Sequence, residues 1–310
     1  MATQKITQIK LQALKAEFDT LRQGKESLLA MIDDAEIPES VYNSNAIENS
    51  TLTLKETEKI LLDMEVSRVV SLREVYEAKN LARVIGYIRG KAQEIELNQE
   101  TILLLHQMLI GGIKDEIAGR FRKKGEYVRV GSYIAPAPEQ IEGMLNELMT
   151  KYSSDLTSFV IDKIAAFHLG LETIHPFNDG DGRIGRVLMN AQLLKQGFPV
   201  IIIRDKEKQA YYTAFDGLRF KQSAKKMEKV VTLALTESLH KRVTYFKGDK
   251  VVTLADYTKR HKSSAVSLLN AARRQSIPAF REKGVWKIGS SWVPNFTKDE
   301  LNHTKKLQSS

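Results

Sequence analysis

The feature that most constrains this chain is the segment at residues 175–186, His-Pro-Phe-Asn-Asp-Gly-Asp-Gly-Arg-Ile-Gly-Arg, which lies between two stretches with helical spacing. Its glycines, Gly180, Gly182 and Gly185, allow positive φ angles that other residues avoid. Residues 184–196 predict a helix, so the glycine-rich loop leads into a helix N-terminus. Free N–H groups and the positive end of the helix dipole at such a terminus favour the binding of an anion.

The side chains of this segment suit phosphate chemistry. Arg183 and Arg186 lie three residues apart on one face of the expected helix, where both can bind phosphate oxygens. Asp179 suits Mg²⁺, which prefers one or two carboxylates together with substrate phosphates. His175 is the group of the segment that can accept a proton near neutral pH. The pattern predicts metal-assisted transfer of a phosphate-bearing group, whereas a simple Gly-Asp turn between two helices would explain only some of these residues.

The segment resembles the signature of Fic-domain proteins, His-Pro-Phe-x-Asp-Gly-x-Gly-Arg-x-x-Arg. Members of this family mostly transfer AMP from ATP to a protein hydroxyl, so the resemblance implies an enzyme, a nucleotidyltransferase of the protein adenylyltransferase (AMPylator) kind. It implies that His175 is the catalytic base and that Asp179 holds Mg²⁺ or Mn²⁺. The residues of the segment implied to bind ATP are Gly180, Asp181, Gly182, Arg183, Ile184, Gly185 and Arg186.

Asp181 departs from the family pattern, which usually has Asn at this position. An amide can donate a hydrogen bond to a phosphate oxygen, whereas an ionised carboxylate can only accept one. Loss of a charge-assisted hydrogen bond is worth about 1.5–3 kcal/mol, or roughly ten- to hundred-fold in rate or affinity. The sequence therefore predicts a weakened site unless Asp181 approaches the metal.

Residues 44–49, Ser-Asn-Ala-Ile-Glu-Asn, resemble the inhibitory motif Ser/Thr-x-x-x-Glu-Gly/Asn that some Fic proteins carry before the Fic core. The resemblance implies that Glu48 pairs bidentately with Arg186 and withdraws this arginine from the γ-phosphate of ATP. ATP then binds in an orientation that prevents in-line attack on the α-phosphate. Ser44 is expected to cap the helix that presents Glu48. Without the Fic signature, the motif would be interpreted as an ordinary cap and an exposed Glu.

Helical spacing stops between residues 119 and 138, where β-branched and aromatic residues are flanked by glycines and followed by prolines. A β-hairpin fits this pattern. In Fic proteins a hairpin called the flap precedes the active-site helices, and its exposed edge can pair with an extended target peptide. A purely structural hairpin is the alternative. The flap residues expected to border ATP are Val130, Gly131, Ser132 and Tyr133.

Most of the remaining chain has helical spacing of its apolar residues. The first 35 residues fit this pattern, and Pro38 is expected to end it, leaving residues 40–49 as a short segment with a polar cap. Tyr211 and Tyr212 resemble family positions that border the adenine, although simple packing would also explain them. Further helices are expected over residues 52–64, 72–91, 97–110, 140–152 and 158–173.

Positive charge is concentrated at the C-terminal end. Residues 241–310 carry 15 Lys and Arg against 5 Asp and Glu, a net charge of +10, whereas the rest of the chain carries 32 against 33. This asymmetry favours an acidic partner for the C-terminal end, with a solvated basic face as the alternative.

The C-terminal end also resembles a winged helix-turn-helix of the excisionase-like kind. The expected elements are a helix from Thr253, a turn at 262–264, a helix over 265–275, and two strands over 277–281 and 285–288. Winged helices bind DNA or dock proteins, so both partners are left open. The cations expected to suit DNA phosphates are Arg273 and Arg274 on the second helix and Arg281, Lys283 and Lys287 on the wing.

The composition excludes several other classes. The chain has 310 residues, 42% hydrophobic and 27% charged, which is ordinary for a globular protein with room for two domains. No stretch approaches the roughly 18–20 apolar residues of a membrane helix and no signal peptide is visible, so we expect a cytoplasmic location. The chain has no cysteine, which excludes disulfides and thiolate metal sites, and its six histidines lack a zinc-binding spacing.

The resemblance implies a mainly α fold: a Fic-type helical core with a β-hairpin flap, and a small C-terminal winged helix-turn-helix domain. The expected function is a self-inhibited adenylyltransferase that moves AMP to a Ser, Thr or Tyr hydroxyl of a protein, itself included, and can also remove it. The alternative is a DNA-binding regulator whose weakened Fic site only senses nucleotide. A homodimer is left open, and no membrane partner is expected.

The expected regions are 1–95 (helical, with the inhibitory motif at 44–49), 96–240 (Fic core, with the flap at 119–138 and the signature loop at 175–186) and 245–310 (winged-helix-like).

Overall fold

The computed structural model describes residues 3–131, 133–221 and 223–293. The chain begins with two long helices, α1 (Lys5–Leu21) and α2 (Glu26–Ile47). α2 continues through Pro38, so the expectations that this proline ends the helix and that residues 40–49 form a separate segment are wrong. A proline inside a helix removes one backbone hydrogen bond and costs about 3 kcal/mol. Burial of the last two turns offsets this cost, because all residues from Val41 to Ile47 except Tyr42 are buried.

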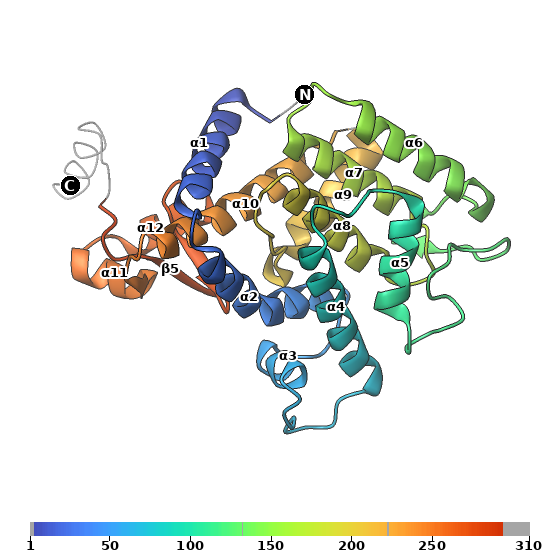
Figure 1. Cartoon of the computed structure of the whole chain (residues 1–310), viewed down its shortest axis with the longest axis horizontal. Helices are drawn as coiled ribbons and strands as arrows, with labels where there is room; N and C mark the ends of the chain where they lie inside the picture. Colours follow the sequence, from blue (N-terminus) through green and yellow to red (C-terminus); the bar gives the residue numbers. More distant parts are fainter. Residues whose placement is uncertain (1–2, 132, 222, 294–310) are drawn as a thin grey trace, which may run out of the picture.

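Three helices with side-chain caps follow. α3 (Leu54–Leu61) begins with a capping box in which Thr53 and Glu56 exchange hydrogen bonds. Ser71 caps α4 (Leu72–Gly90), and Asn98 caps α5 (Gln99–Ile110). The predicted helices over 52–64, 72–91 and 97–110 are therefore confirmed. α3 and the loop that joins it to α4 project from the body of the molecule (Figure 1).

The hairpin expected within residues 119–138 is present. Its strands, β1 (Arg129–Val130) and β2 (Tyr133–Ile134), are antiparallel and only two residues long. Gly131 lies at the turn with φ 61°. Most of the flap is therefore irregular backbone.

The helices around residues 175–186 come next. η1 (Pro138–Gln140) leads into α6 (Ile141–Ser154), and α7 (Val160–Ile174) precedes α8 (Asp181–Lys195). α7 and α8 pack against each other, and α4 and α5 pack on α8. α8 begins three residues earlier than predicted, so the loop between the helices comprises only residues 175–180. Its Phe177 is fully buried in the core beneath it.

The helical body ends with η2 (Asp205–Glu207), α9 (Lys208–Lys221) and α10 (Lys225–Phe246). α10 packs against α1, α7 and α9. Its buried residues share a second core with residues of α1 and α2, such as Phe18 and Ile32. The region 1–95 is thus packed together with the later helices. The expected domain boundaries stay predictions.

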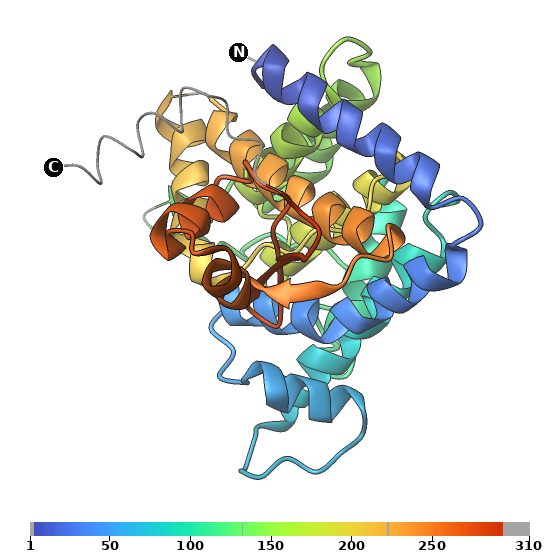
Figure 2. The same cartoon turned by 90° about the vertical axis from the view of Figure 1, so that its left-hand side faces the viewer.

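The C-terminal unit, residues 251–289, contains β3 (Val251–Thr253), α11 (Leu254–His261), α12 (Ala265–Arg273), β4 (Phe280–Glu282) and β5 (Val285–Gly289). Its sheet is antiparallel in the order β3-β5-β4 and covers a small core of its own. Both predicted helices, the turn and both predicted strands are present, whereas β3 was not expected. The unit lies beside α2 and α10, at the far end of the molecule from α5 and α6 (Figures 1 and 2). No helix in the described part of the chain is long and apolar enough to cross a membrane.

Candidate functional site

The loop between α7 and α8 reverses the chain sharply. His175 caps α7 in the left-handed conformation, with φ 50°, and its N–H still bonds to the carbonyl of Leu171 (2.8 Å). This conformation is costly for a residue other than glycine. Gly180 precedes α8 with φ 95°, which only glycine adopts without strain. The reversal brings the His175 ring beside the first turn of α8.

Two carboxylates flank His175. Its Nε2 lies 3.2 Å from Oδ2 of Asp181, and its Nδ1 lies 3.8 Å from Oε2 of Glu172. The other oxygen of Asp181 accepts the backbone N–H of Phe177 (3.0 Å). Burial raises the pKa of Asp181 well above its ordinary value, and the Glu172 carboxylate adds to the shift. Asp181 therefore faces the histidine, and its expected contact with phosphates or metal stays a prediction.

Arg122 fixes the backbone on which His175 stands. This buried guanidinium donates to the carbonyl oxygens of His175 (2.9 Å), Pro136 (2.9 Å) and Glu126 (2.9 Å). The backbone N–H of Arg122 bonds to the carbonyl of Pro176 (2.9 Å). The Arg122 side chain thus connects the flap, at Glu126 and Pro136, to the loop at His175.

His106 supports the loop from below. Its ring stacks on Phe177 at 3.7 Å between centroids. Nδ1 accepts the backbone N–H of Gly119 (3.0 Å), so Nε2 carries the hydrogen that faces the carbonyl of Asp179 (2.9 Å). Burial lowers the pKa of His106 to about 4, so the ring is neutral at pH 7.

Asp179 is surrounded by cations. Its Oδ2 lies 2.7 Å from Arg73 and 3.6 Å from Lys114, and its Oδ1 lies 2.9 Å from Arg183, which also pairs with Glu77 (3.2 Å). Burial raises the pKa of Asp179, but Arg183 and Arg73 outweigh burial and lower it, so the carboxylate is ionised. An ionised carboxylate that is 20% exposed fits a Mg²⁺ ion that arrives with phosphates. The described residues hold no cluster of three or more metal-binding side chains.

Arg186 is buried and held by α2. Its Nη2 contacts Oε1 of Glu48 (2.9 Å) and the carbonyl of Ser44 (2.8 Å), and its Nε donates to the Ser44 hydroxyl (2.9 Å). The expected pairing of Arg186 with Glu48 is present, but through one N–H instead of two. Ser44, which was expected to cap a helix, lies inside α2 and binds the arginine directly.

The Glu48 carboxylate rests on the backbone of α8. A Cβ atom on Gly182 would lie 2.2 Å from Oε1 of Glu48, so only glycine leaves room for this contact. Gly182 belongs to the first turn of α8, where free N–H groups attract anions. The carboxylate therefore occupies the helix terminus at which a phosphate was expected.

The remaining residues predicted to bind ATP divide into two groups. Tyr211 is buried with its hydroxyl 2.7 Å from Nε2 of His168, which differs from the expected position beside an adenine. Ile184 is also buried, and a Cβ on Gly185 would lie 2.7 Å from Glu172. Their expected contact with ATP stays a prediction. Tyr212 is 40% exposed and donates to the carbonyl of Ile47 (2.7 Å), next to Glu48.

The flap lies against the end of α7. The hydroxyl of Tyr133 donates to the carbonyl of Thr173 (3.1 Å), close to His175. Val130 and Gly131 form the tip of the hairpin, and Ser132 lies outside the described residues. Ile134 is 67% exposed and pairs across the hairpin with Arg129, which is also exposed.

The cations of the wing all take part in ion pairs, and their expected contact with DNA stays a prediction. Arg281 pairs with Glu237 and Glu207, Lys283 with Glu58, and Lys287 with Glu282. Arg273 and Arg274 on the second helix are exposed.

Sequence analysis missed several residues of this site. Glu172 lies three residues before His175, so its helical spacing was a usable signal. Arg122 lies within the segment 119–138, for which the sequence predicted only a hairpin. Arg73 is 106 residues from Asp179, and no local pattern links them.

Comparison with known families and proteins gives a consistent result. Residues 96–193 match the model of the Fic/DOC family. A protein adenylyltransferase Fic from Nematostella vectensis is 34% identical over 180 residues, covering 56% of this chain and 41% of that protein. The one from Drosophila willistoni is 30% identical over 207 residues, covering 65% and 41%. The chain thus spans about two fifths of the length of these relatives.

Solved structures share the fold. A Fic-domain signaling protein from Bacteroides thetaiotaomicron has a TM-score of 0.70 at 24% identity, over 77% of this chain and 97% of that one. A Fic family protein from Desulfovibrio desulfuricans has a TM-score of 0.66 at 19% identity, over 94% and 98%. These likenesses show the fold, including its mainly helical character.

Proposed function

Because residues 96–193 form a Fic domain, we propose that this chain is a protein adenylyltransferase that inhibits itself. It moves AMP from ATP to a Ser, Thr or Tyr hydroxyl of a protein that docks along the flap. The adenylyltransferase names of the relatives and the loop before α8 support this activity.

The observation that carries self-inhibition is the position of the Glu48 carboxylate. It lies 2.9 Å from Nη2 of Arg186 and directly over Gly182. Glu48 therefore competes with the triphosphate both for an arginine and for the N-terminal end of α8. With Arg186 engaged by Ser44 and Glu48, ATP lacks the partner that orients its γ-phosphate.

The reacting group is His175. It accepts the proton of the target hydroxyl, whose oxygen attacks the α-phosphorus while the bond to the β-phosphate oxygen breaks and pyrophosphate leaves. Glu172 on one side of the ring stabilises the positive charge that the imidazole gains, and Asp181 on the other side positions the ring. Arg122 holds the backbone of His175 during the step. When Glu48 instead aligns a water molecule, the same site removes AMP from a modified protein.

Asp179 would hold Mg²⁺ or Mn²⁺ together with the phosphates of ATP, and the ion would supply positive charge that offsets the charge of the leaving group. Arg73 and Lys114, which now pair with Asp179, would then be free to contact the phosphates.

Labelling with ATP that carries ³²P in the α-phosphate tests the function. The Glu48→Gly variant should retain label on the denatured protein, and the same variant with His175→Ala should not. ATP labelled in the γ-phosphate is the control, because it labels the product of a kinase but not of an adenylyltransferase. Absence of α-label from Glu48→Gly at millimolar Mg²⁺, with intact ATP binding, would contradict the proposal.

A second candidate function, a nucleotide-sensing DNA-binding regulator, is favoured by the exposed cations of the C-terminal unit. Lys259, Arg260, Lys262, Arg273 and Arg274 are all exposed near the ends of α11 and α12. Their contact with phosphates would release counterions, so affinity for duplex DNA should fall steeply with salt. Binding that is absent even at low salt would exclude this candidate and favour protein docking.

A further inference from the structure

The turn between β4 and β5 is attached to the helix that carries Ser44 and Glu48. Glu39 of α2 accepts the backbone N–H of Lys283 at Oε2 (3.0 Å) and that of Gly284 at Oε1 (3.0 Å). Glu39 is only 5% exposed. A buried carboxylate of α2 therefore receives the tip of the C-terminal hairpin.

The backbone of the turn explains why both N–H groups are available. Glu282 pairs with Val285 across the two strands, so Lys283 and Gly284 are the central residues of a two-residue hairpin turn. Their φ angles are 50° and 77°. Successive N–H groups in such a turn form a concave site for an anion, and Glu39 supplies that anion.

A buried network of ion pairs strengthens this attachment. Glu36, one turn before Glu39, lies 3.0 Å from Nζ of Lys241, and the same Nζ lies 3.3 Å from Glu282 beside the turn. Charges buried in this way are screened much less by water and salt than surface pairs. Glu39 itself pairs with Arg204, which also pairs with Glu237, and Glu237 pairs in turn with Arg281. Arg242 joins Glu36 to Asp33.

Hydrogen bonds of Asn43 connect Glu39 with the inhibitory residues further along α2. Asn43, one turn further, donates to the carbonyl of Glu39 (2.7 Å) and accepts the N–H of Asp205 (3.0 Å), and Ser44 follows directly. Pro38 removes a backbone hydrogen bond just before Glu39, so the first half of the helix constrains the second half weakly. Side-chain contacts from Glu39 onward therefore decide where Ser44 and Glu48 lie.

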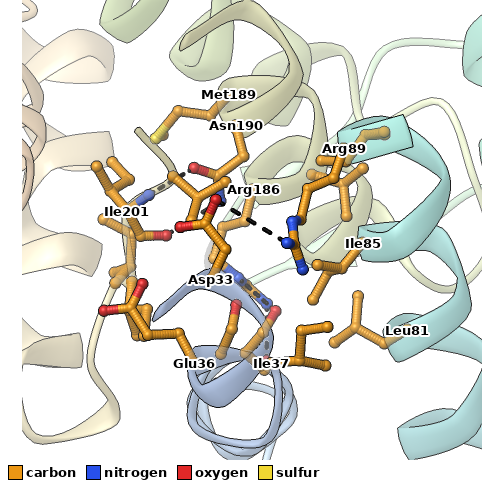
Figure 3. Close-up of a pocket in the computed structure, with 17 residues that line it drawn as sticks. Asp33, Glu36, Ile37, Leu81, Ile85, Arg89, Arg186, Met189, Asn190 and Ile201 are labelled. Atoms are coloured by element: carbon orange, nitrogen blue, oxygen red, sulfur yellow. Dashed lines mark hydrogen bonds and ion pairs between the residues drawn. The ribbon is translucent and has the colours of Figure 1, made fainter. Parts of the chain in front are cut away.

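A pocket behind α2 leaves this part of the helix room to shift. It is lined by residues of α2, α4, α8 and the segment 200–203, and it includes Ser40, Ser44 and Arg186. Figure 3 shows Ile37 of α2 opposite Leu81 and Ile85 of α4 in this pocket. A helix packed at full density cannot move without opening a void, whereas a helix that borders a pocket can.

We propose that the β4–β5 turn is a clamp on α2 that sets the strength of self-inhibition. When the C-terminal unit moves away from Glu39, the last turns of α2 loosen, Ser44 and Glu48 leave Arg186, and the site becomes active. This inference rests on the proposed function, since it names the regulation of the same site.

The test uses the full chain with Glu39→Gln, which keeps the shape of the side chain but removes its charge and one acceptor oxygen. Asp34→Asn is the matched control, because Asp34 lies on the same helix, is 69% exposed and, among the described residues, pairs only with Arg89. Hydrogen–deuterium exchange of residues 40–49 should become at least about tenfold faster in Glu39→Gln, because the substitution weakens the bonds of residue 39 to the turn and to Arg204. Exchange should stay unchanged in Asp34→Asn. Self-labelling with AMP should rise in Glu39→Gln by roughly three- to tenfold.

A double variant separates the clamp from other effects. In the Glu48→Gly background, Glu39→Gln should add less than about a factor of two to labelling, because the inhibition it loosens is already absent. Insertion of two residues between Lys283 and Gly284 disrupts only the contact of the turn and leaves the pair of Glu39 with Arg204, so it should also make residues 40–49 exchange faster. Unchanged exchange of residues 40–49 in either variant would overturn the clamp. Faster exchange without labelling, even in Glu48→Gly, would retain the clamp and refute the proposed function instead.

Discussion

Replacement of Glu48 by Gly separates inhibition from catalysis most directly. The change removes the carboxylate that contacts Arg186 and covers Gly182. It should disturb the fold little, because Glu48 is the C-terminal cap residue of α2 and its side chain is 39% exposed. Arg186 should then be held by Ser44 but no longer by Glu48, which makes it available to the γ-phosphate, and the end of α8 should be open to the triphosphate.

The size of the effect follows from the geometry. A charge-assisted hydrogen bond is worth about 1.5–3 kcal/mol when buried, and an exposed ion pair about 0–1 kcal/mol. Glu48 is partly exposed and makes one contact of 2.9 Å with Arg186, which places its contribution at about 1–2 kcal/mol. Self-labelling with AMP should therefore rise about five- to thirtyfold. Affinity for ATP should change less, because Ser44 still holds Arg186 until the nucleotide binds.

The assay is the initial rate of self-labelling at matched Mg²⁺ and ATP, with ATP affinity measured separately by calorimetry. Ser44→Ala should give a smaller increase than Glu48→Gly, because the backbone carbonyl of residue 44 still accepts a hydrogen bond from Arg186. Addition of Arg186→Ala to Glu48→Gly should abolish the gain. Equal labelling of Glu48→Gly and the unmodified protein would refute the argument. Residues 44–49 would then be only the end of a helix, without an inhibitory role.

Three further predictions concern the loop and its support. His175→Ala should lower the rate of AMP transfer by about 10²–10⁴-fold, because a general base acts mainly in the transition state. Calorimetry should show that ATP binding is retained. Transfer at the original rate would exclude His175 as the base. Asp181→Asn should keep the Kd for ATP within about threefold of the unmodified protein, because the side chain faces His175 and the Phe177 amide. Any change in single-turnover labelling should therefore appear in the rate constant. A large loss of ATP affinity would instead show that residue 181 contacts the phosphates. His106 has a pKa lowered from 6.5 to about 4 in the folded protein. Between pH 6.5 and 4, the unfolded chain therefore binds a proton that the native ring does not bind. As the pH is lowered through this window, the free energy of unfolding should decrease by about 1.4 kcal/mol per pH unit. Urea denaturation should show a shallower pH dependence for His106→Gln, and an unchanged dependence would contradict the buried, neutral ring.

The sequence alone determined the features that depend on neighbouring residues. Apolar spacing placed most helices to within a few residues, because amphipathic periodicity is a local property. The glycines and polar residues of 175–186 predicted a loop that leads into a helix N-terminus, and φ 95° at Gly180 agrees with that prediction. Glycines and β-branched residues likewise located the hairpin and the elements of the C-terminal unit.

Only the tertiary structure decided which side chains meet across different elements. It turned Asp181 toward His175, buried Tyr211, and attached Arg281 to Glu237 instead of leaving it exposed. It also allowed α2 to pass through Pro38, because burial in the core outweighs the lost backbone hydrogen bond. Local propensity and spacing fix the face of an element on which a residue lies, but the partner of that face is set by packing between segments that are far apart in the chain. A carboxylate such as Glu39 therefore acquires its role only when a turn more than 240 residues later folds onto it.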